Sequence, residues 1–175
     1  GLGSTWTNGG EFYVGFSGPG LLTIRNQGLV TSGSSRVGSS ATGEVNVVGA
    51  GSTWNITEGV HVGYYGKGTL TISSRGLVRV QGALTIDEKE TGNSFVNMAT
   101  HGMLALWGQA DGSLAEFLGL VDGTDAIRYW NDDLLDCDDI TNATAGMDYN
   151  LTYLSEGGMA GYTVLTVPEP AALPL

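Results

Sequence analysis

Residues 62–72 read VGYYGKGTLTI, and this stretch decides the fold because the first half of the chain repeats it. Related stretches are VGFSGPGLLTI at residues 14–24 and VGSSATGEVNV at residues 37–47. Each contains Val-Gly, four further residues, a glycine and, one residue later, an aliphatic-polar-aliphatic triplet. The three copies begin 23 and 25 positions apart. A repeat of this length is typical of a solenoid.

The sequence also repeats over an interval twice as long. Gly-Ser-Thr-Trp at residues 3–6 returns at residues 51–54, and Leu-Thr-Ile at residues 22–24 returns at residues 70–72, each 48 positions later. The 48-residue unit therefore contains two related turns of about 24 residues. Alternation within the triplets turns the aliphatic residues inward and leaves Thr23, Asn46 and Thr71 outside. We therefore predict an all-β fold, a β-solenoid (β-helix) of about 24-residue coils with glycines at its corners.

The second half of the chain is less regular. Aliphatic triplets return at Leu84–Ile86 and Leu104–Leu106, and we interpret them as further triplet strands in the last, irregular coils. Ser113 followed by Glu116 is a capping-box pattern, which predicts a two-turn helix that ends near Gly123 and covers the stack. Strand-like composition follows at residues 126–130, 148–154 and 162–167. These features predict solenoid repeats over residues 1–110, an acidic cap of helix and strands over 111–167, and a tail over 168–175.

Composition separates the two halves further. The chain has 175 residues and a net charge of −11, yet residues 1–80 carry five basic and three acidic side chains. The remaining residues carry two basic and fifteen acidic side chains, so the acidic character lies outside the repeats. Nucleic-acid binding is disfavoured, because it needs clustered positive charge. No apolar run is long enough to predict a membrane span, and no leader is visible, so the chain is cytosolic or has lost its leader.

The repeat and the end of the chain resemble known families. Gly-Ser-Thr-Trp followed by Val-Gly-x4-Gly-x-Leu-Thr-Ile resembles, over residues 3–86, the repeat of autotransporter-type adhesins and PEP-CTERM exported proteins. Pro168, Glu169 and Pro170 look like the opening of a PEP-CTERM sorting signal. The resemblance implies an exported bacterial protein of the envelope or extracellular space, sorted by an exosortase-type membrane protease and associated with exopolysaccharide and biofilm. It implies no activity.

The best candidate for a metal site is an acidic segment. Asp132, Asp136 and Asp138 could supply carboxylate oxygens to calcium, which prefers several oxygen ligands on a flexible loop. An EF-hand is disfavoured, because Cys137 stands where the loop needs glycine and Ala143 where it needs a bidentate glutamate. A solvated acidic loop without metal is the alternative that we favour.

Other candidate sites carry weaker patterns. Asn55, Asn142 and Asn150 each begin an N-glycosylation sequon. The residues Phe16, Tyr64 and Tyr65 follow Val-Gly corners, where they could stack on sugars, although packing on a neighbouring coil is the simpler interpretation. His61 and His101 are interpreted as surface residues, and the lone Cys137 as incidental. Because no nucleophile elbow or phosphate loop is found, we expect no enzymatic activity and no cofactor other than calcium.

Two functions are consistent with these features. The first is a structural, cell-surface or extracellular protein that associates head-to-tail into a fibre, sheath or matrix, since a solenoid with an unpaired terminal coil presents open strand edges. The second is an adhesin or polysaccharide-binding solenoid, the stalk of a larger surface protein, which a row of exposed aromatic residues on one face would distinguish. A polysaccharide lyase ranks lower, because the acidic cluster lies outside the repeats.

Overall fold

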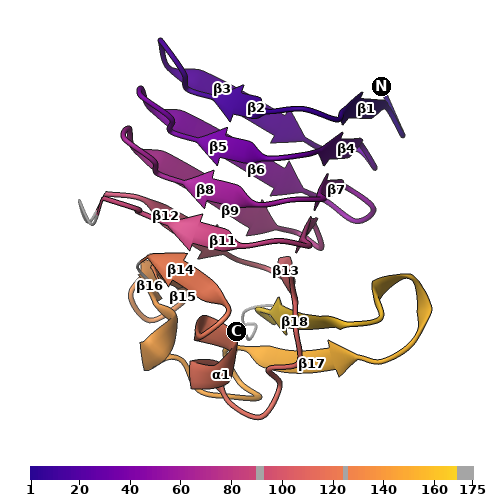
Figure 1. The fold of residues 1–175 in the computed structure, drawn as a ribbon. Helices are drawn as coiled ribbons and strands as arrows, with labels where there is room; N and C mark the ends of the chain where they lie inside the picture. The colour runs from indigo at the N-terminus through magenta and orange to yellow at the C-terminus, as the bar shows by residue number, and fades with distance from the viewer. Residues whose placement is uncertain (90–92, 124–125, 169–175) are drawn as a thin grey trace.

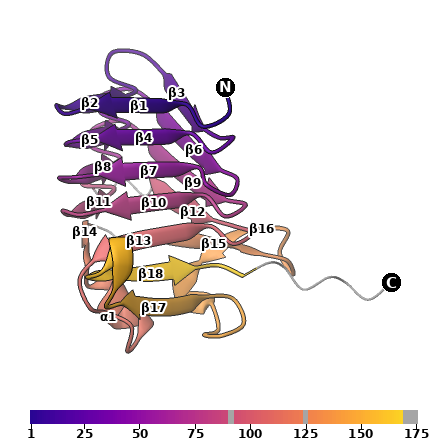
Figure 2. The same ribbon diagram turned by 90° about the vertical axis from the view of Figure 1, so that its right-hand side faces the viewer.

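The computed structural model describes residues 1–89, 93–123 and 126–168 and shows a parallel β-solenoid (Figure 1). Each coil contributes one short strand to each of three sheets, and successive coils stack along one axis (Figure 2). The parallel strands of sheet A are β1 (Thr5–Asn8), β4 (Leu29–Ser32), β7 (Thr53–Ile56), β10 (Leu77–Val80) and β13 (Met103–Trp107).

The other two sheets complete each coil. Sheet B contains β2 (Phe12–Val14), β5 (Ser35–Val37), β8 (Val60–Val62), β11 (Leu84–Ile86) and β14 (Val121–Gly123). Sheet C contains β3 (Gly20–Ile24), β6 (Gly43–Val48), β9 (Gly68–Ser73), β12 (Phe95–Met98) and β15 (Ile127–Asn131).

The register confirms the predicted period. In sheet A, Thr5 pairs with Leu29, Leu29 with Thr53 and Thr53 with Leu77, so successive partners lie 24 residues apart. The pairing is parallel throughout these coils. Thr23, Asn46 and Thr71 lie in one row on the outside of sheet C, as the alternation predicted.

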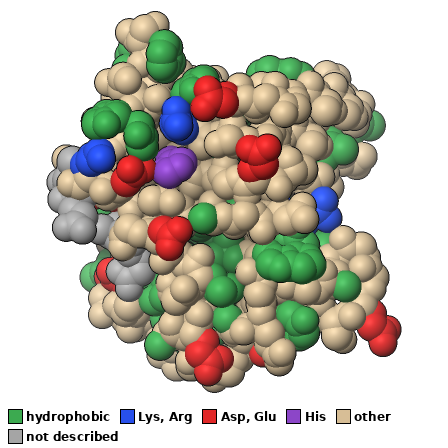
Figure 3. All heavy atoms as spheres, viewed as in Figure 1, with side chains coloured by type: hydrophobic (Ala, Val, Ile, Leu, Met, Phe, Trp, Pro, Cys, Tyr) green, Lys and Arg blue, Asp and Glu red, His purple; other side chains and the backbone are tan. Residues whose placement is uncertain are grey.

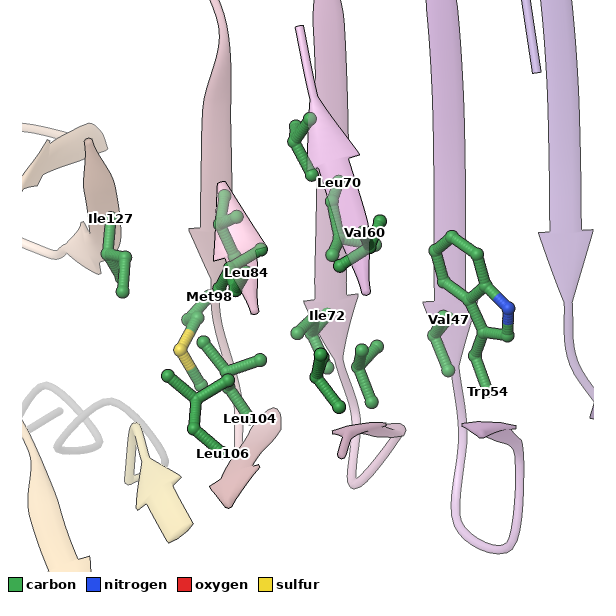
Figure 4. Packing of buried hydrophobic residues seen from close by; sticks show 14 of the residues in the cluster. Val47, Trp54, Val60, Leu70, Ile72, Leu84, Met98, Leu104, Leu106 and Ile127 are labelled. Atoms are coloured by element: carbon green, nitrogen blue, oxygen red, sulfur yellow. The ribbon is translucent and has the colours of Figure 1, made fainter. Parts of the chain in front are cut away.

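Aliphatic ladders fill the interior. Val45 and Leu70 pair across adjacent coils and are fully buried, as are Val47 and Ile72. Figure 4 shows Val47, Leu70 and Ile72 facing the interior together with buried side chains of the other sheets, such as Val60 and Leu84. Trp54 lies in the same core with no exposed surface, and its Nε1 donates a hydrogen bond of 2.9 Å to Ser32 Oγ of the preceding coil. The indole is therefore buried without an unsatisfied donor.

The second half corrects two predictions. Leu84–Ile86 is not another triplet strand of sheet C, because it pairs with Val60–Val62 in sheet B. The successor of Leu70–Ile72 in sheet C is Val96–Met98. Strands of sheet B and of sheet C both turn alternate aliphatic side chains inward, so the triplet pattern alone does not show to which sheet a strand belongs. Leu104–Leu106 likewise belongs to sheet A, in strand β13.

The predicted helix is shorter than expected. Helix α1 covers Leu114–Leu118, with the Ser113 side chain accepting a hydrogen bond from the backbone N–H of Glu116 as the capping box predicted. It ends early because Val121 already pairs with Leu84 in sheet B, which leaves room for little more than one turn after Ser113. This helix is too short to cross a membrane, and none of the helices in the described ranges could do so.

Antiparallel strands close the C-terminal end of the stack. Strand β18 (Tyr162–Thr166) pairs antiparallel with β13, and β17 (Asn150–Leu154) pairs with β18. Strand β16 (Asp136–Asp139) adds antiparallel to β15, followed by the short 3-10 helix η1 (Ile140–Asn142), and a second one, η2 (Gly157–Met159), precedes β18. Buried residues of this region, including Phe117 and Leu165, belong to the same hydrophobic core as the coils. Repeats and cap therefore share one interior.

Candidate functional site

The outer face of sheet B brings together side chains from successive coils. Strands β2, β5 and β8 are three residues long, with the first and third residues buried, so the middle residue points to solvent. The middle residues Tyr13, Arg36 and His61 pair in register across β2, β5 and β8. Each directly precedes the Val-Gly corner of its coil. The repeat thus stacks a phenol, a guanidinium and an imidazole in one row.

Arg36 connects the first three coils. Its guanidinium carbon lies 5.5 Å from the centre of the Tyr13 ring and 4.8 Å from the centre of the Tyr64 ring. Its Nη1 donates a hydrogen bond of 3.1 Å to the Tyr13 hydroxyl and lies 3.9 Å from Glu11 Oε1. Tyr13 in turn donates to Glu11 Oε2 at 2.5 Å. Within the described part of the chain, Arg36 Nε is buried and has no hydrogen-bond partner.

The third and fourth coils extend this arrangement. His61 Nδ1 and Glu88 Oε2 lie 2.8 Å apart, and Lys89 Nζ lies 3.7 Å from Glu88 Oε1. Tyr64 packs edge-on against both His61 and Tyr65, with ring centres 5.4 Å and 4.4 Å apart. The Lys89 ammonium lies 5.0 Å from the centre of the Tyr65 ring. Tyr64 is therefore the centre of a cluster that joins three coils.

We call this cluster the outer patch, and Figure 3 shows its face, where a histidine is surrounded by basic, acidic and hydrophobic side chains. Phe16 and Tyr65 are its most accessible aromatic residues, with 58% and 65% of their surface exposed. Phe16 packs against Tyr13, with ring centres 5.1 Å apart. The members of the outer patch are Glu11, Tyr13, Phe16, Arg36, His61, Tyr64, Tyr65, Glu88 and Lys89.

Two phenols of the outer patch, those of Tyr13 and Tyr64, have pKa values raised above the ordinary value of tyrosine. The hydrogen bond to Glu11 is the main cause that raises the pKa of Tyr13, with burial adding to it. A side-chain hydrogen bond with Tyr65 is the main cause that raises the pKa of Tyr64. At neutral pH both hydroxyls are therefore protonated, and that of Tyr13 donates to Glu11 while accepting from Arg36.

Only part of this cluster was predicted from the sequence. The sequence pattern places Phe16, Tyr64 and Tyr65 at corners and favours their packing on a neighbouring coil. Tyr64 and Tyr65 do contact Arg36 and Lys89 of adjacent coils, whereas Phe16 packs on Tyr13 of its own coil. His61 lies on the outer face, as expected. Tyr13 and the charged members were not identified. A usable signal was present, because Tyr13, Arg36 and His61 occupy the same position before Val-Gly in consecutive repeats.

The acidic segment is a hairpin rather than the loop expected from the sequence. Asp132 lies in the turn and accepts a hydrogen bond from Trp130 Nε1 at 3.0 Å. Asp136 and Asp138 lie on strand β16. Hydrogen bonds from the Asn142 side chain and then the Asp139 backbone are the main causes that lower the pKa of Asp138.

In the described ranges no three His, Cys, Asp or Glu side chains lie close enough together to hold a metal ion. Calcium binding by Asp132, Asp136 and Asp138 stays a prediction. Calorimetric titration of chelator-treated protein tests it.

The remaining candidate residues are scattered over the molecule. Asn55 points outward on β7, Asn142 ends helix η1, and Asn150 is exposed at the start of β17. Pro168 follows β18, while Glu169 and Pro170 lie outside the described residues. Cys137 is half-buried on β16, and burial is the main cause that raises the pKa of its thiol.

Comparisons of the chain with protein-family models, with curated proteins and with solved structures found no match. The outer patch is therefore interpreted from its own geometry.

Proposed function

We propose that this chain is a non-enzymatic binding module that uses the outer patch to hold a polysaccharide outside the cell. The observation that supports this function is the continuous row of aromatic rings and hydrogen-bonding side chains on one face, which runs from Phe16 in the first coil to Tyr65 in the third. This row is the feature that distinguishes a binding solenoid from a purely structural one.

The chemistry of the outer patch suits sugar rings. Aromatic faces pack against the C–H groups of a pyranose, and Phe16 and Tyr65 offer largely exposed rings. Carboxylates accept and guanidinium groups donate the hydrogen bonds that hydroxyl groups make, and Glu11 and Arg36 supply both within one contact network. Parallel strands stack about 4.8 Å apart, so the first and third coils are separated by roughly 10 Å. A polymer can contact such a row through consecutive sugar units.

The expected location supports the same function. The resemblance to PEP-CTERM exported proteins favours an extracellular or cell-surface position and sorting by an exosortase-type protease, with exopolysaccharide as the partner at hand. Pro168 directly follows the buried residue Val167, so a sorting tail would begin just after the last described strand.

A pull-down with insoluble polysaccharides tests the proposal. The wild-type protein should sediment with at least one polysaccharide, and the double variant F16A/Y65A should lose most of this binding. Both side chains are largely exposed, so the fold should survive their truncation. Trp130→Ala is the matched control, because Trp130 is an exposed aromatic residue on β15, outside the outer patch. Release of reducing ends from the bound polymer would contradict the non-enzymatic assignment.

Head-to-tail self-association is the second candidate. In the described residues, β1, β2 and β3 each have a strand neighbour on one side only, and Trp6 and Leu21 on this coil are 49% and 66% exposed. At the opposite end, sheets A and C finish in the antiparallel strands β17 and β16, while sheet B finishes in the parallel strand β14. Because a repeating contact must join these unlike ends, we rank it second. Negative-stain microscopy and sedimentation velocity decide it: filaments support it, and a monomer at high concentration excludes it.

A further inference from the structure

We propose that the outer patch selects an uncharged polysaccharide over a uronate or sulfated one. This inference rests on the proposed function and concerns the substrate class of the same site. It follows from the way in which the charges of the outer patch are paired with one another.

The positive charges of the outer patch are already matched. Arg36 faces Glu11 at 3.9 Å, and Lys89 faces Glu88 at 3.7 Å. Two basic side chains and two carboxylates therefore cancel when His61 is neutral. A polyanion needs an excess of positive charge, as nucleic-acid sites show. Lys67 lies in the same corner segment as Tyr64 and Tyr65, and including it would add only one positive charge. The chain as a whole carries a net charge of −11, which also disfavours a polyanion.

The carboxylates also argue directly against an anionic ligand. Glu11 is the most exposed charged member of the outer patch, with 61% of its side chain accessible, and it lies beside the guanidinium of Arg36. The carboxylate or sulfate group of such a ligand can only accept hydrogen bonds, so it would be repelled by Glu11 and would compete with it for Arg36. A hydroxyl group both donates and accepts, and can bond to the carboxylate and the guanidinium at once.

Arg36 presents part of its guanidinium to such a hydroxyl group, since 28% of its side chain is exposed. Its Nε is buried and its Nη1 already contacts Tyr13 and Glu11, so a ligand meets the Nη end of the guanidinium. The planar guanidinium is held between Tyr13 and Tyr64, which fixes the direction of the remaining N–H groups. A fixed planar donor beside an exposed carboxylate is suited to the neighbouring hydroxyl groups of a neutral sugar.

Affinity electrophoresis of the folded protein tests this inference. Gels contain a neutral galactomannan or mixed-linkage glucan, an alginate, or dextran sulfate, each at low and at raised sodium chloride. We expect retardation by a neutral polymer that persists at raised salt, and none by either polyanion. Binding to alginate or dextran sulfate that weakens steeply with salt would overturn the inference while leaving the proposed function standing. Absence of binding to any polysaccharide would overturn both.

Arg36→Lys is the most informative variant, because it keeps the charge and removes the planar fork. If a neutral sugar is bound through directed N–H groups, R36K should weaken binding by roughly tenfold or more. If charge alone holds a polyanion, R36K should bind as tightly as the wild type. Arg25→Lys is the matched control, since Arg25 is exposed in the loop after β3 and belongs to no contact of the outer patch. Circular dichroism checks that each variant is folded.

Discussion

The guanidinium of Arg36 lies over the Tyr64 ring at 4.8 Å, although the two residues are 28 positions apart in the chain. The contact joins the second coil to the third on the outside of the stack, where no aliphatic ladder contributes. Arg36 precedes the Val-Gly corner of the second coil, and Tyr64 follows the Val-Gly corner of the third. Stacking of the coils brings these two positions together. A functional surface is thereby built from single residues of separate repeats.

This contact predicts a measurable coupling. Cation–π pairs at exposed sites contribute about 0.5–1 kcal/mol. A double-mutant cycle with Arg36→Ala and Tyr64→Ala should return a coupling energy in that range from urea denaturation. The pair Arg25 and Tyr64 serves as the control and should show additive effects. Additive effects for Arg36 and Tyr64 as well would mean that the stacking contributes nothing to stability.

Truncation of Trp54 should destabilise the protein much more than loss of the contact between Arg36 and Tyr64. The side chain has no exposed surface, so Trp54→Ala should lower the free energy of unfolding by about 3–5 kcal/mol. Trp130→Ala, at an exposed indole, should lower it far less. Guanidinium denaturation followed by circular dichroism measures both variants. Equal destabilisation by the two substitutions would contradict the placement of Trp54 in the core.

Much of the fold could be predicted from the sequence, because Val-Gly and the aliphatic triplets recur at a period that only a solenoid explains. The sheet that holds Leu84–Ile86 could not, since a buried aliphatic pair alternating with a polar residue fits sheet B as well as sheet C. The intervals between paired strands also lengthen near the cap: Leu84 pairs with Val60 on one side and with Val121 on the other. Such insertions remove the regular spacing that identified earlier coils.

The outer patch was harder to predict for a different reason. Its residues are separated in the chain, and their proximity depends on the register between coils. Tyr13 and Arg36 pair because 23 residues separate β2 from β5 at this position, and a shift of one residue would turn one of them into the core. Aromatic residues stand out in a sequence, whereas the pairing of Glu88 with His61 depends on the return path of the fourth coil.

The acidic hairpin predicts a pH-dependent change. Hydrogen bonding, chiefly from Asn142, holds the pKa of Asp138 below its ordinary value, so its carboxylate stabilises the folded state above the ordinary aspartate pKa. This contribution is lost as the pH falls through the lowered pKa. Asn142→Ala should move the pKa of Asp138 up toward the ordinary range, as NMR titration of the carboxyl carbons would show. Asn150→Ala should leave it unchanged, and an unchanged value in N142A would refute the assignment.

Gly43 lies at a corner where the addition of a single methyl group should disrupt the stacking of the coils. A Cβ atom at Gly43 would lie 2.2 Å from the Gly38 nitrogen and 2.2 Å from the Val14 carbonyl oxygen, and both are backbone atoms of a tight corner. Gly43→Ala should therefore lower the free energy of unfolding by about 1–3 kcal/mol or more, because the corners of two coils must separate. Gly18→Ala is the matched control, since a Cβ there meets nothing within 4 Å. Thermal and urea unfolding of both variants should show a large loss for G43A and a change within about 0.5 kcal/mol for G18A. A stable G43A protein would mean that the coils are not packed this closely at the corner.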